Sequence, residues 1–246
     1  MVTRSRGVEV SEHQLVKEQA GSFLQWLDTW FAGLQPLALA GVLREPAQVA
    51  IVSIDLINGF CYEGNLSSPR VAAIVPAVAD LLQRARGAGV RHFLMIQECH
   101  SEHAEEFQAF GPHGICGTSE AEMIPEVRAL PFSSEFKIFH KNSIHAVEGT
   151  AMEGWLAEHP EVATFIVVGD CTDLCVFDAA MDLKLRANML DLPRRVIVPE
   201  NAVQTYDLPV EAAARIGAMP HDGDLLHRLF LYQMALNKIE VVKSLE

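Results

Sequence analysis

The chain has 246 residues and carries 32 acidic against 19 basic side chains, a formal net charge of −13. Half of its residues are hydrophobic, which is enough to bury the core of one large α/β domain or two small ones. The acidic balance and the lack of a Lys/Arg-rich run argue against nucleic acid and anionic membrane as partners. No uninterrupted run of about 18 apolar residues occurs, so we expect no transmembrane helix.

The N-terminus and the cysteines bear on the compartment. The opening segment, "MVTRSRGVEVSEHQ", has no apolar stretch after its two arginines, so a cytoplasmic location is expected. The cysteines are odd in number and lie at positions 61, 99, 116, 171 and 175. In a reducing compartment we expect all of them to be thiols, without a disulfide framework.

The N-terminal segment is predicted to form a helix. Apolar residues recur at helical spacing between Val16 and Phe31, and Ser11 with Gln14 fits a capping box. Tryptophans in this segment suit core packing, with contact to a second subunit as the alternative. The stretch "LREPAQ" breaks the helical pattern. Residues 1–46 are therefore predicted to form an N-terminal helical extension, and residues 47–246 one domain.

Beyond residue 47, apolar runs alternate with helical patterns. Helices are predicted over 71–89 and from about Asp173. Strands are predicted at 49–55, 91–97, 135–141, 164–170 and 194–200, with an edge strand at 238–245. Runs that are apolar on both faces and separated by helices predict a three-layer, Rossmann-like α/β fold with a mostly parallel sheet. No glycine-rich phosphate loop follows a strand, so no nucleotide cofactor is expected.

Reactive side chains collect where the predicted strands end. In open parallel sheets, ligands bind beyond the carboxyl ends of the strands, and Asp55 and Lys141 end two of them. Cys171 and Cys175 follow a third. Cys175 falls in the first turn of a helix, whose free N–H groups and partial positive charge are expected to lower the thiol pKa. Each residue alone has a purely structural reading. Together they favour a nucleophile with a proton acceptor and a cation.

Three motifs point to a family. The segments "SIDLINGF", "KNSIHAVEGT" and "VVGDCTDLCV" together resemble the isochorismatase-like cysteine hydrolases, which include the nicotinamidases. The resemblance runs from about Val49 to about Asn201, so the predicted domain 47–246 is identified as an isochorismatase-like hydrolase domain. It implies a catalytic triad and an oxyanion hole formed by two N–H groups beside a cis peptide bond. The triad would be Asp55, Lys141 and Cys175, the cis bond Asp170–Cys171, and the N–H groups those of Cys171 and Cys175.

A second signal lies in "QECHSEHAEEFQAFGPHGICGTSEAE", where histidines stand among glutamates. Imidazole and carboxylate groups suit Zn²⁺, Fe or Mn²⁺, although such loops are also often only solvated. Nicotinamidases carry metal ligands in similar motifs, and in that group the metal holds the pyridine nitrogen of the substrate. The resemblance thus implies a divalent metal, zinc first and iron or manganese as alternatives. Its ligands here would be Glu98, His100 and His113, with Glu106 as a further one.

The chain departs from the nicotinamidase pattern at two positions. Glu98 stands where aspartate is usual, and Ile144 stands where a pocket aromatic is usual. Phe60 and Phe110 match two pocket-wall aromatics, although both also suit a hydrophobic core. We therefore expect a cysteine-dependent amidase that converts nicotinamide to nicotinate and ammonia through an acyl-thioester on Cys175. The alternatives are a carbamoyl- or ureido-compound hydrolase without a catalytic metal and a non-catalytic binder. The resemblance also implies a homo-oligomer.

Overall fold

The computed structural model describes residues 12–246, with side chains from Ala20 onward, so the predicted cap at Ser11 lies outside the described residues. Contacts divide the chain into a unit that ends at Leu34 and a unit spanning Gln35–Glu246. The described part of the first unit forms the helix α1 (Glu12–Ala32), as the sequence predicts. Among the helices that the structure describes, none is long and apolar enough to cross a membrane.

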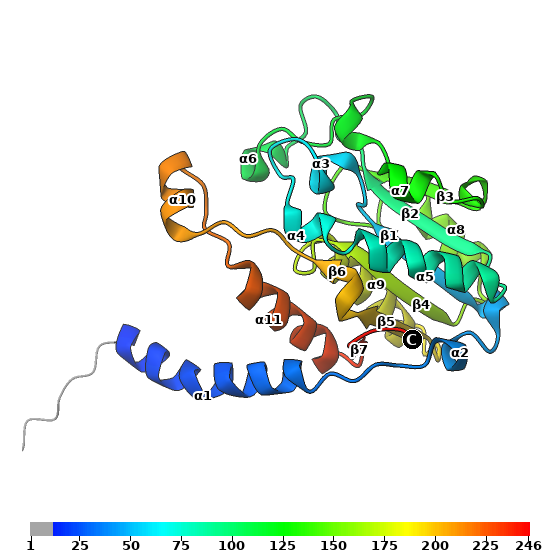
Figure 1. The fold of residues 1–246 in the computed structure, drawn as a ribbon, viewed down its shortest axis with the longest axis horizontal. Helices are drawn as coiled ribbons and strands as arrows, with labels where there is room; N and C mark the ends of the chain where they lie inside the picture. The colour runs from blue at the N-terminus through cyan, green and yellow to red at the C-terminus, as the bar shows by residue number, and fades with distance from the viewer. Residues whose placement is uncertain (1–11) are drawn as a thin grey trace, which may run out of the picture. The chain divides into compact units, whose positions relative to one another are not determined.

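The second unit is built around one sheet. Every pairing between its described strands is parallel, in the order β3-β2-β1-β4-β5-β7, with the short β6 beside β4 (Figure 1). The predicted parallel sheet is confirmed. The strands are β1 (Val49–Ile54), β2 (His92–Glu98), β3 (Lys137–Lys141), β4 (Thr164–Asp170), β5 (Arg195–Pro199), β6 (Val203–Gln204) and β7 (Glu240–Val242).

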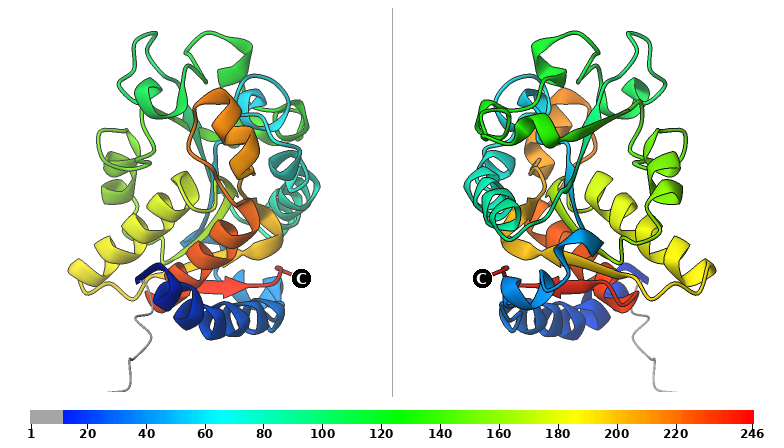
Figure 2. Two further views of the ribbon diagram at one scale, coloured as in Figure 1. Left: turned by 90° about the vertical axis from the view of Figure 1, so that its left-hand side faces the viewer. Right: turned by 90° about the vertical axis from the view of Figure 1, so that its right-hand side faces the viewer.

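Helices cover both faces of the sheet, which confirms the three-layer fold. In Figure 2, α5 lies on one face, and α8 and α9 lie on the other. The helices of this unit are α2 (Leu39–Val42), α3 (Asn58–Cys61), α4 (Pro69–Ala72), α5 (Val75–Gly87), α6 (Phe107–Phe110), α7 (Pro125–Arg128), α8 (Met152–Glu158), α9 (Cys175–Met189), α10 (Val210–Ile216) and α11 (Gly223–Leu236). Short 3-10 turns are η1 (Pro46–Gln48), η2 (Ser119–Ala121), η3 (Ser133–Glu135) and η4 (Glu200–Ala202).

The helix predicted over 71–89 is two helices, α4 and α5. Pro76 lies in the first turn of α5, where its missing N–H costs no helical hydrogen bond. A proline further inside a continuous helix would remove such a bond, so the chain breaks the helix before it.

The central strands fix the positions of the residues that follow them. All residues of β1 and β4 are buried, as expected for strands covered on both faces. At the end of β4, Gly169 has φ 112°, and a Cβ there would collide with the carbonyl oxygen of Ile54 in β1. Only glycine permits this close approach. The carboxyl ends of β1 and β4 are therefore held side by side.

Candidate active site

Asp55, Lys141 and Cys175 come together at the carboxyl edge of the sheet. The Nζ of Lys141, the last residue of β3, lies 2.8 Å from Asp55 Oδ2 and 3.4 Å from Cys175 Sγ. Asp55 follows β1 with φ 52°, a left-handed conformation that aspartate tolerates, and its Oδ1 accepts the backbone N–H of Glu98 at 2.8 Å. All three side chains are buried. An acid, a cation and a thiol thus share one buried site.

Burial controls the charge states of this group. It raises the pKa of Asp55 to about 6, against the opposing effect of Lys141. Burial also raises the pKa of the Cys175 thiol well above its usual range, although Lys141 acts to lower it. The lowered thiol pKa expected from the helix terminus is therefore wrong. The raised pKa favours the neutral thiol, whose proton must leave when the sulfur attacks.

Cys175 and Cys171 occupy different positions in the turn between β4 and α9. Cys175 is the first residue of α9, so its N–H has no acceptor within the helix. The Asp170–Cys171 peptide bond is cis, and the carbonyl of Cys171 accepts the N–H groups of Leu174 and Val176 at 3.1 and 3.0 Å. Burial raises the pKa of the Cys171 thiol well above its usual range. Cys171 is thus a buried part of the turn that presents Cys175.

Two histidines from the C-terminal segment support this turn, and the sequence reasoning missed them. His221 Nε2 is 2.8 Å from Asp173 Oδ2, and His227 Nδ1 is 2.9 Å from Thr172 Oγ1. The four side chains are buried. The partners are separated by 48 and 55 positions along the chain, so no local spacing could have revealed them.

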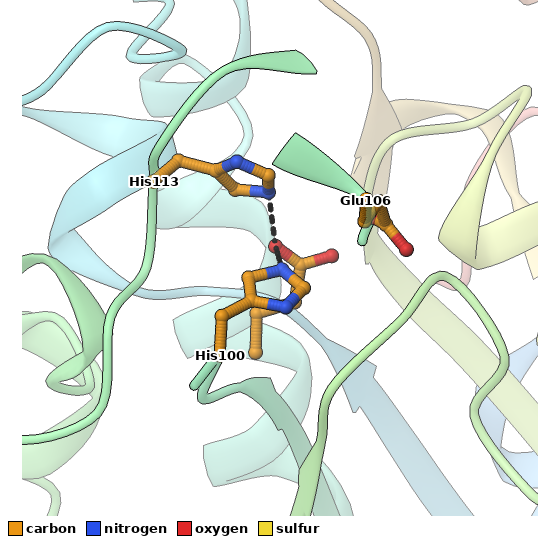
Figure 3. A group of neighbouring side chains, drawn as sticks. His100, Glu106 and His113 are labelled. Carbon is orange, nitrogen blue, oxygen red and sulfur yellow. Dashed lines mark ion pairs between the residues drawn. The ribbon is translucent and has the colours of Figure 1, made fainter. Parts of the chain in front are cut away.

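Glu98, His100 and His113 lie together, and Glu98 also contacts Lys141. The two histidines are labelled in Figure 3, with Glu106 nearby. Glu98 Oε2 is 3.2 Å from His100 Nε2 and 3.0 Å from His113 Nε2. The opposite ring nitrogens are engaged elsewhere: His100 Nδ1 with Asn142 Oδ1 at 3.1 Å, and His113 Nδ1 with the carbonyl of Gly111 at 2.8 Å. Such outer hydrogen bonds orient metal-binding imidazoles and leave each Nε2 as the ligand atom. The donor set therefore fits a divalent transition metal.

Glu106 lies close to Glu98 and the two histidines. Ligand atoms of Glu98, His100, Glu106 and His113 all lie within 4.8 Å of one another. One oxygen of Glu106 already accepts the N–H of Ile144 at 3.0 Å. Burial is the largest single influence on the pKa of His100 and His113 and lowers it, but the hydrogen bond to Glu98, the charge of Glu98 and a second hydrogen bond together leave each pKa above its usual value.

The longer side chain of Glu98 lets it contact both groups. Its Oε1 lies 2.8 Å from Lys141 Nζ and 3.7 Å from Cys175 Sγ, while Oε2 faces the histidines. Although burial opposes its ionisation, Lys141 and the imidazoles hold the pKa of Glu98 well below its usual range. One ionised carboxylate therefore joins the histidine cluster to the lysine and the thiol.

The expectation that all cysteines are thiols is wrong for two of them. Cys99 and Cys116 form a disulfide, whereas Cys61, Cys171 and Cys175 are free. The residues that follow β2 run beside residues 114–116. The N–H of His100 donates to the carbonyl of Gly114 at 2.9 Å, and the carbonyl of His100 accepts the N–H of Cys116 at 2.9 Å. This pairing brings the two Cα atoms to 4.5 Å. Arguments from compartment and cysteine count cannot detect such a local pairing.

A pocket opens beside Cys175, and Phe60, Phe110 and Ile144 border it as the sequence comparison suggests. Phe60 is also part of the hydrophobic core, so both of its readings apply. Aromatic contacts link Phe60 and Phe110 to His113, with ring centroids 5.9 and 6.4 Å apart. Sequence reasoning missed the pocket roles of three further residues: Leu66, Leu174 and Tyr206. Leu174 stands in the motif "VVGDCTDLCV", directly before Cys175, whereas Leu66 and Tyr206 lie outside the quoted motifs.

Comparisons with known proteins identify the family of the chain. The family model described as "Isochorismatase domain" matches residues 49–221. Nicotinamidase 1 of Arabidopsis thaliana is 29% identical over 219 residues, covering 83% of this chain and 89% of that protein.

Solved structures share the fold. N-carbamoylsarcosine amidase from Thermoplasma acidophilum has a TM-score of 0.62 at 22% identity, with 81% of this chain and 98% of that chain covered. The pyrazinamidase of Pyrococcus horikoshii, in complex with zinc, has a TM-score of 0.60 at 21% identity, with 80% and 99% covered. The family model spans most of the chain, and the chain belongs to the isochorismatase domain family and is a hydrolase of that family.

Proposed function

We propose that this hydrolase cleaves the C–N bond of a small amide, with nicotinamide as the expected substrate and nicotinate and ammonia as the products. The observation that supports this most directly is the position of Lys141 Nζ. It lies 2.8 Å from both Asp55 and Glu98 and 3.4 Å from Cys175 Sγ. One cation therefore contacts the base, the nucleophile and the carboxylate of the histidine cluster. The curated nicotinamidase relative agrees with this substrate class.

In the proposed reaction, Cys175 and Asp55 make and break the bonds. The thiol proton passes to Asp55 while Sγ attacks the amide carbon, and Asp55 then delivers that proton to the departing nitrogen, which leaves as ammonia. The resulting acyl-thioester reacts with water, whose proton goes to Asp55 and then to the released sulfur. Lys141 stabilises the transient thiolate. The N–H groups of Cys171 and Cys175 hold the developing oxyanion.

Glu98, His100 and His113, with Glu106 beside them, would hold a divalent ion, zinc first and iron or manganese as alternatives. When bound, such an ion would act as a Lewis acid toward the ring nitrogen of a pyridine carboxamide. Phe60 and Phe110 border the pocket on the same side as His113 and would exclude water from the ring. The zinc complex of the related-fold pyrazinamidase agrees with this assignment.

A second candidate is the hydrolysis of a carbamoyl or ureido compound, with His100 and His113 in a structural role only. Two observations favour it over other amides: the similarity in fold to an N-carbamoylsarcosine amidase, and Ile144 at the pocket wall in place of an aromatic side chain.

Ammonia release tests the proposal. Protein purified without chelator is incubated with nicotinamide and, separately, with N-carbamoylglycine. Wild type should release ammonia from nicotinamide, and Cys175→Ala should release none. Cys61→Ala, which removes another buried thiol, is the matched control and should remain active. Ammonia from the carbamoyl compound alone would favour the second candidate, and an active Cys175→Ala protein would contradict both. A homo-oligomer is also proposed, and sedimentation equilibrium should give a multiple of the chain mass.

A further inference from the structure

Asp170, the last residue of β4, carries a carboxyl group that the proposed reaction leaves unused. Asp170 is only 1% exposed and is among the residues that border the same pocket as Cys175 and His113. Oδ2 accepts the thiol S–H of Cys171 at 3.5 Å. Oδ1 has no hydrogen-bond partner among the residues that the structure describes. Because burying a polar oxygen without a partner is unfavourable, a bound molecule is the natural source of the missing hydrogen bond.

The surroundings of Asp170 determine which hydrogen bonds it can make. Burial, and then the carboxyl groups of Asp55 and Glu98, raise the pKa of Asp170 well above its usual range. Lys141 is already shared between those two carboxylates. A carboxyl group kept neutral in this way both donates through its O–H and accepts through its carbonyl oxygen. It therefore suits a hydroxyl or carbonyl group of a ligand.

Nicotinamide alone offers Asp170 nothing of this kind. Its amide nitrogen faces Asp55, its carbonyl oxygen faces the N–H groups of Cys171 and Cys175, and its ring nitrogen belongs to the histidine cluster in the reaction proposed above. Only ring C–H groups remain, and these cannot pair with a buried carboxyl oxygen. The bound amide therefore needs one more polar group if the site is to be fully paired.

We propose that Asp170 is a specificity-determining residue that hydrogen-bonds to an additional hydroxyl or oxo group of the substrate, so that the preferred substrate is a polar-substituted pyridine carboxamide. This inference rests on the amide hydrolysis proposed above and narrows its substrate class. Nicotinamide remains a substrate, but a poorer one. A site with a buried hydrogen-bonding group discriminates strongly against an analogue that leaves it unpaired, whereas an apolar pocket rejects an added hydroxyl only weakly.

The test compares kcat/KM for nicotinamide with kcat/KM for its ring-hydroxylated derivatives. Both are measured on metal-loaded wild type, Asp170→Asn and Asp170→Leu. Wild type should favour at least one hydroxylated amide by about tenfold or more, mainly through KM. Asp170→Asn, which keeps a donor and an acceptor, should retain that preference within about threefold. Asp170→Leu should lose it and gain activity on nicotinamide. A wild type that prefers nicotinamide, or an unchanged preference in Asp170→Leu, would overturn the inference.

Asp182→Leu is the matched control. Asp182 also has a carboxyl oxygen without a partner among the described residues, but it does not border the pocket. Its replacement should leave the substrate preference as in wild type. Thermal melting and iodoacetamide labelling of Cys175 identify any variant that has lost its fold or its site.

A separate binding measurement distinguishes failure of this inference from failure of the proposed reaction. Calorimetric titration of Cys175→Ala with the same amides reports affinity without turnover. If no amide is hydrolysed by wild type, the proposed reaction fails. A hydroxylated amide that still binds more tightly than nicotinamide, with the difference lost when Asp170→Leu is added, would uphold the specificity role. Equal binding of all the amides would overturn it.

Discussion

Asp55 should set the acid limb of the pH profile. Its pKa is raised by burial to about 6, and only its carboxylate form can take the proton of the Cys175 thiol. Because that form is lost as the pH falls through this value, kcat/KM should decline by about tenfold for each further unit of acidity. Ammonia release measured between pH 5 and pH 8 checks this. A rate that stays flat down to pH 5 would contradict the role of Asp55 as the base.

The free cysteines of the β4–α9 turn should differ in reactivity. Cys175 lies 3.4 Å from the Lys141 cation, whereas the Cys171 thiol faces the carboxyl group of Asp170 at 3.5 Å. Iodoacetamide should therefore label Cys175 much faster than Cys171 at neutral pH. Cys175→Ala should abolish turnover, and Cys171→Ala should mainly lower the melting temperature. Mass spectrometry of labelled peptides gives the comparison, and equal rates at the two thiols would refute the assignment.

Asp55 and Lys141 should behave as one unit, because their side chains are in direct contact. Asp55→Asn and Lys141→Met should each lower kcat by about 10²–10⁴-fold, the range typical of a general acid–base group. The double mutant should be little worse than either single one, since residues that act together give non-additive losses. Losses that multiply in the double mutant would show that the two side chains act independently.

The disulfide should hold the histidine cluster in place. Cys99 and Cys116 close the loop that contains His100, Glu106 and His113. Cys99→Ser with Cys116→Ser should lower the free energy of unfolding by about 3 kcal/mol, the loop-closure effect for a loop of this size. Metal content and the affinity for nicotinamide should fall as well. Elemental analysis, chemical denaturation and KM provide the readouts.

The rate of Cys175 alkylation should be unaffected by this change, because Lys141 reaches the thiol from β3 and not from the loop. Cys61→Ala serves as the control, since it removes a thiol without opening a loop. Full metal retention in the double serine variant would argue against a holding role for the disulfide.

The sequence revealed the long, buried elements of the fold and missed the short ones. The strands β1, β2, β4 and β5 are mainly apolar, and their parallel arrangement follows from the helices between them. The strand β3 reads KIFHK and is exposed at three of its five positions, so its signal is weaker. The two-residue β6 and the four-residue helices are too short to show a period. Asp55, Lys141 and Cys175 could be grouped in advance because the ends of parallel strands share one edge. His221 and His227, and the pairing of Cys99 with Cys116, depend on tertiary packing and left no local signal.

The hydrophobic core of the sheet should not depend on the histidine cluster. The buried residues of β1 and β4 pack between helices, whereas His100 and His113 lie in the loop that follows β2. His100→Ala with His113→Ala should therefore remain folded while losing about one bound divalent ion per chain. Activity on nicotinamide should fall mainly through a higher KM. Circular dichroism and elemental analysis check both parts, and an unfolded double variant would show that the cluster is a structural requirement.

Glu98 and Lys141 are register partners in the β2–β3 pairing, and this has an evolutionary consequence. Side chains on a strand alternate between the two faces, so inserting or deleting one residue in β2 or β3 would turn one of the pair away from the other. Because Glu98 contacts both the histidines and Lys141, such an insertion or deletion would also separate the histidine cluster from the lysine. Inheritable change within β2 and β3 should therefore proceed by substitution, while changes in length are better tolerated in loops that carry none of the site residues.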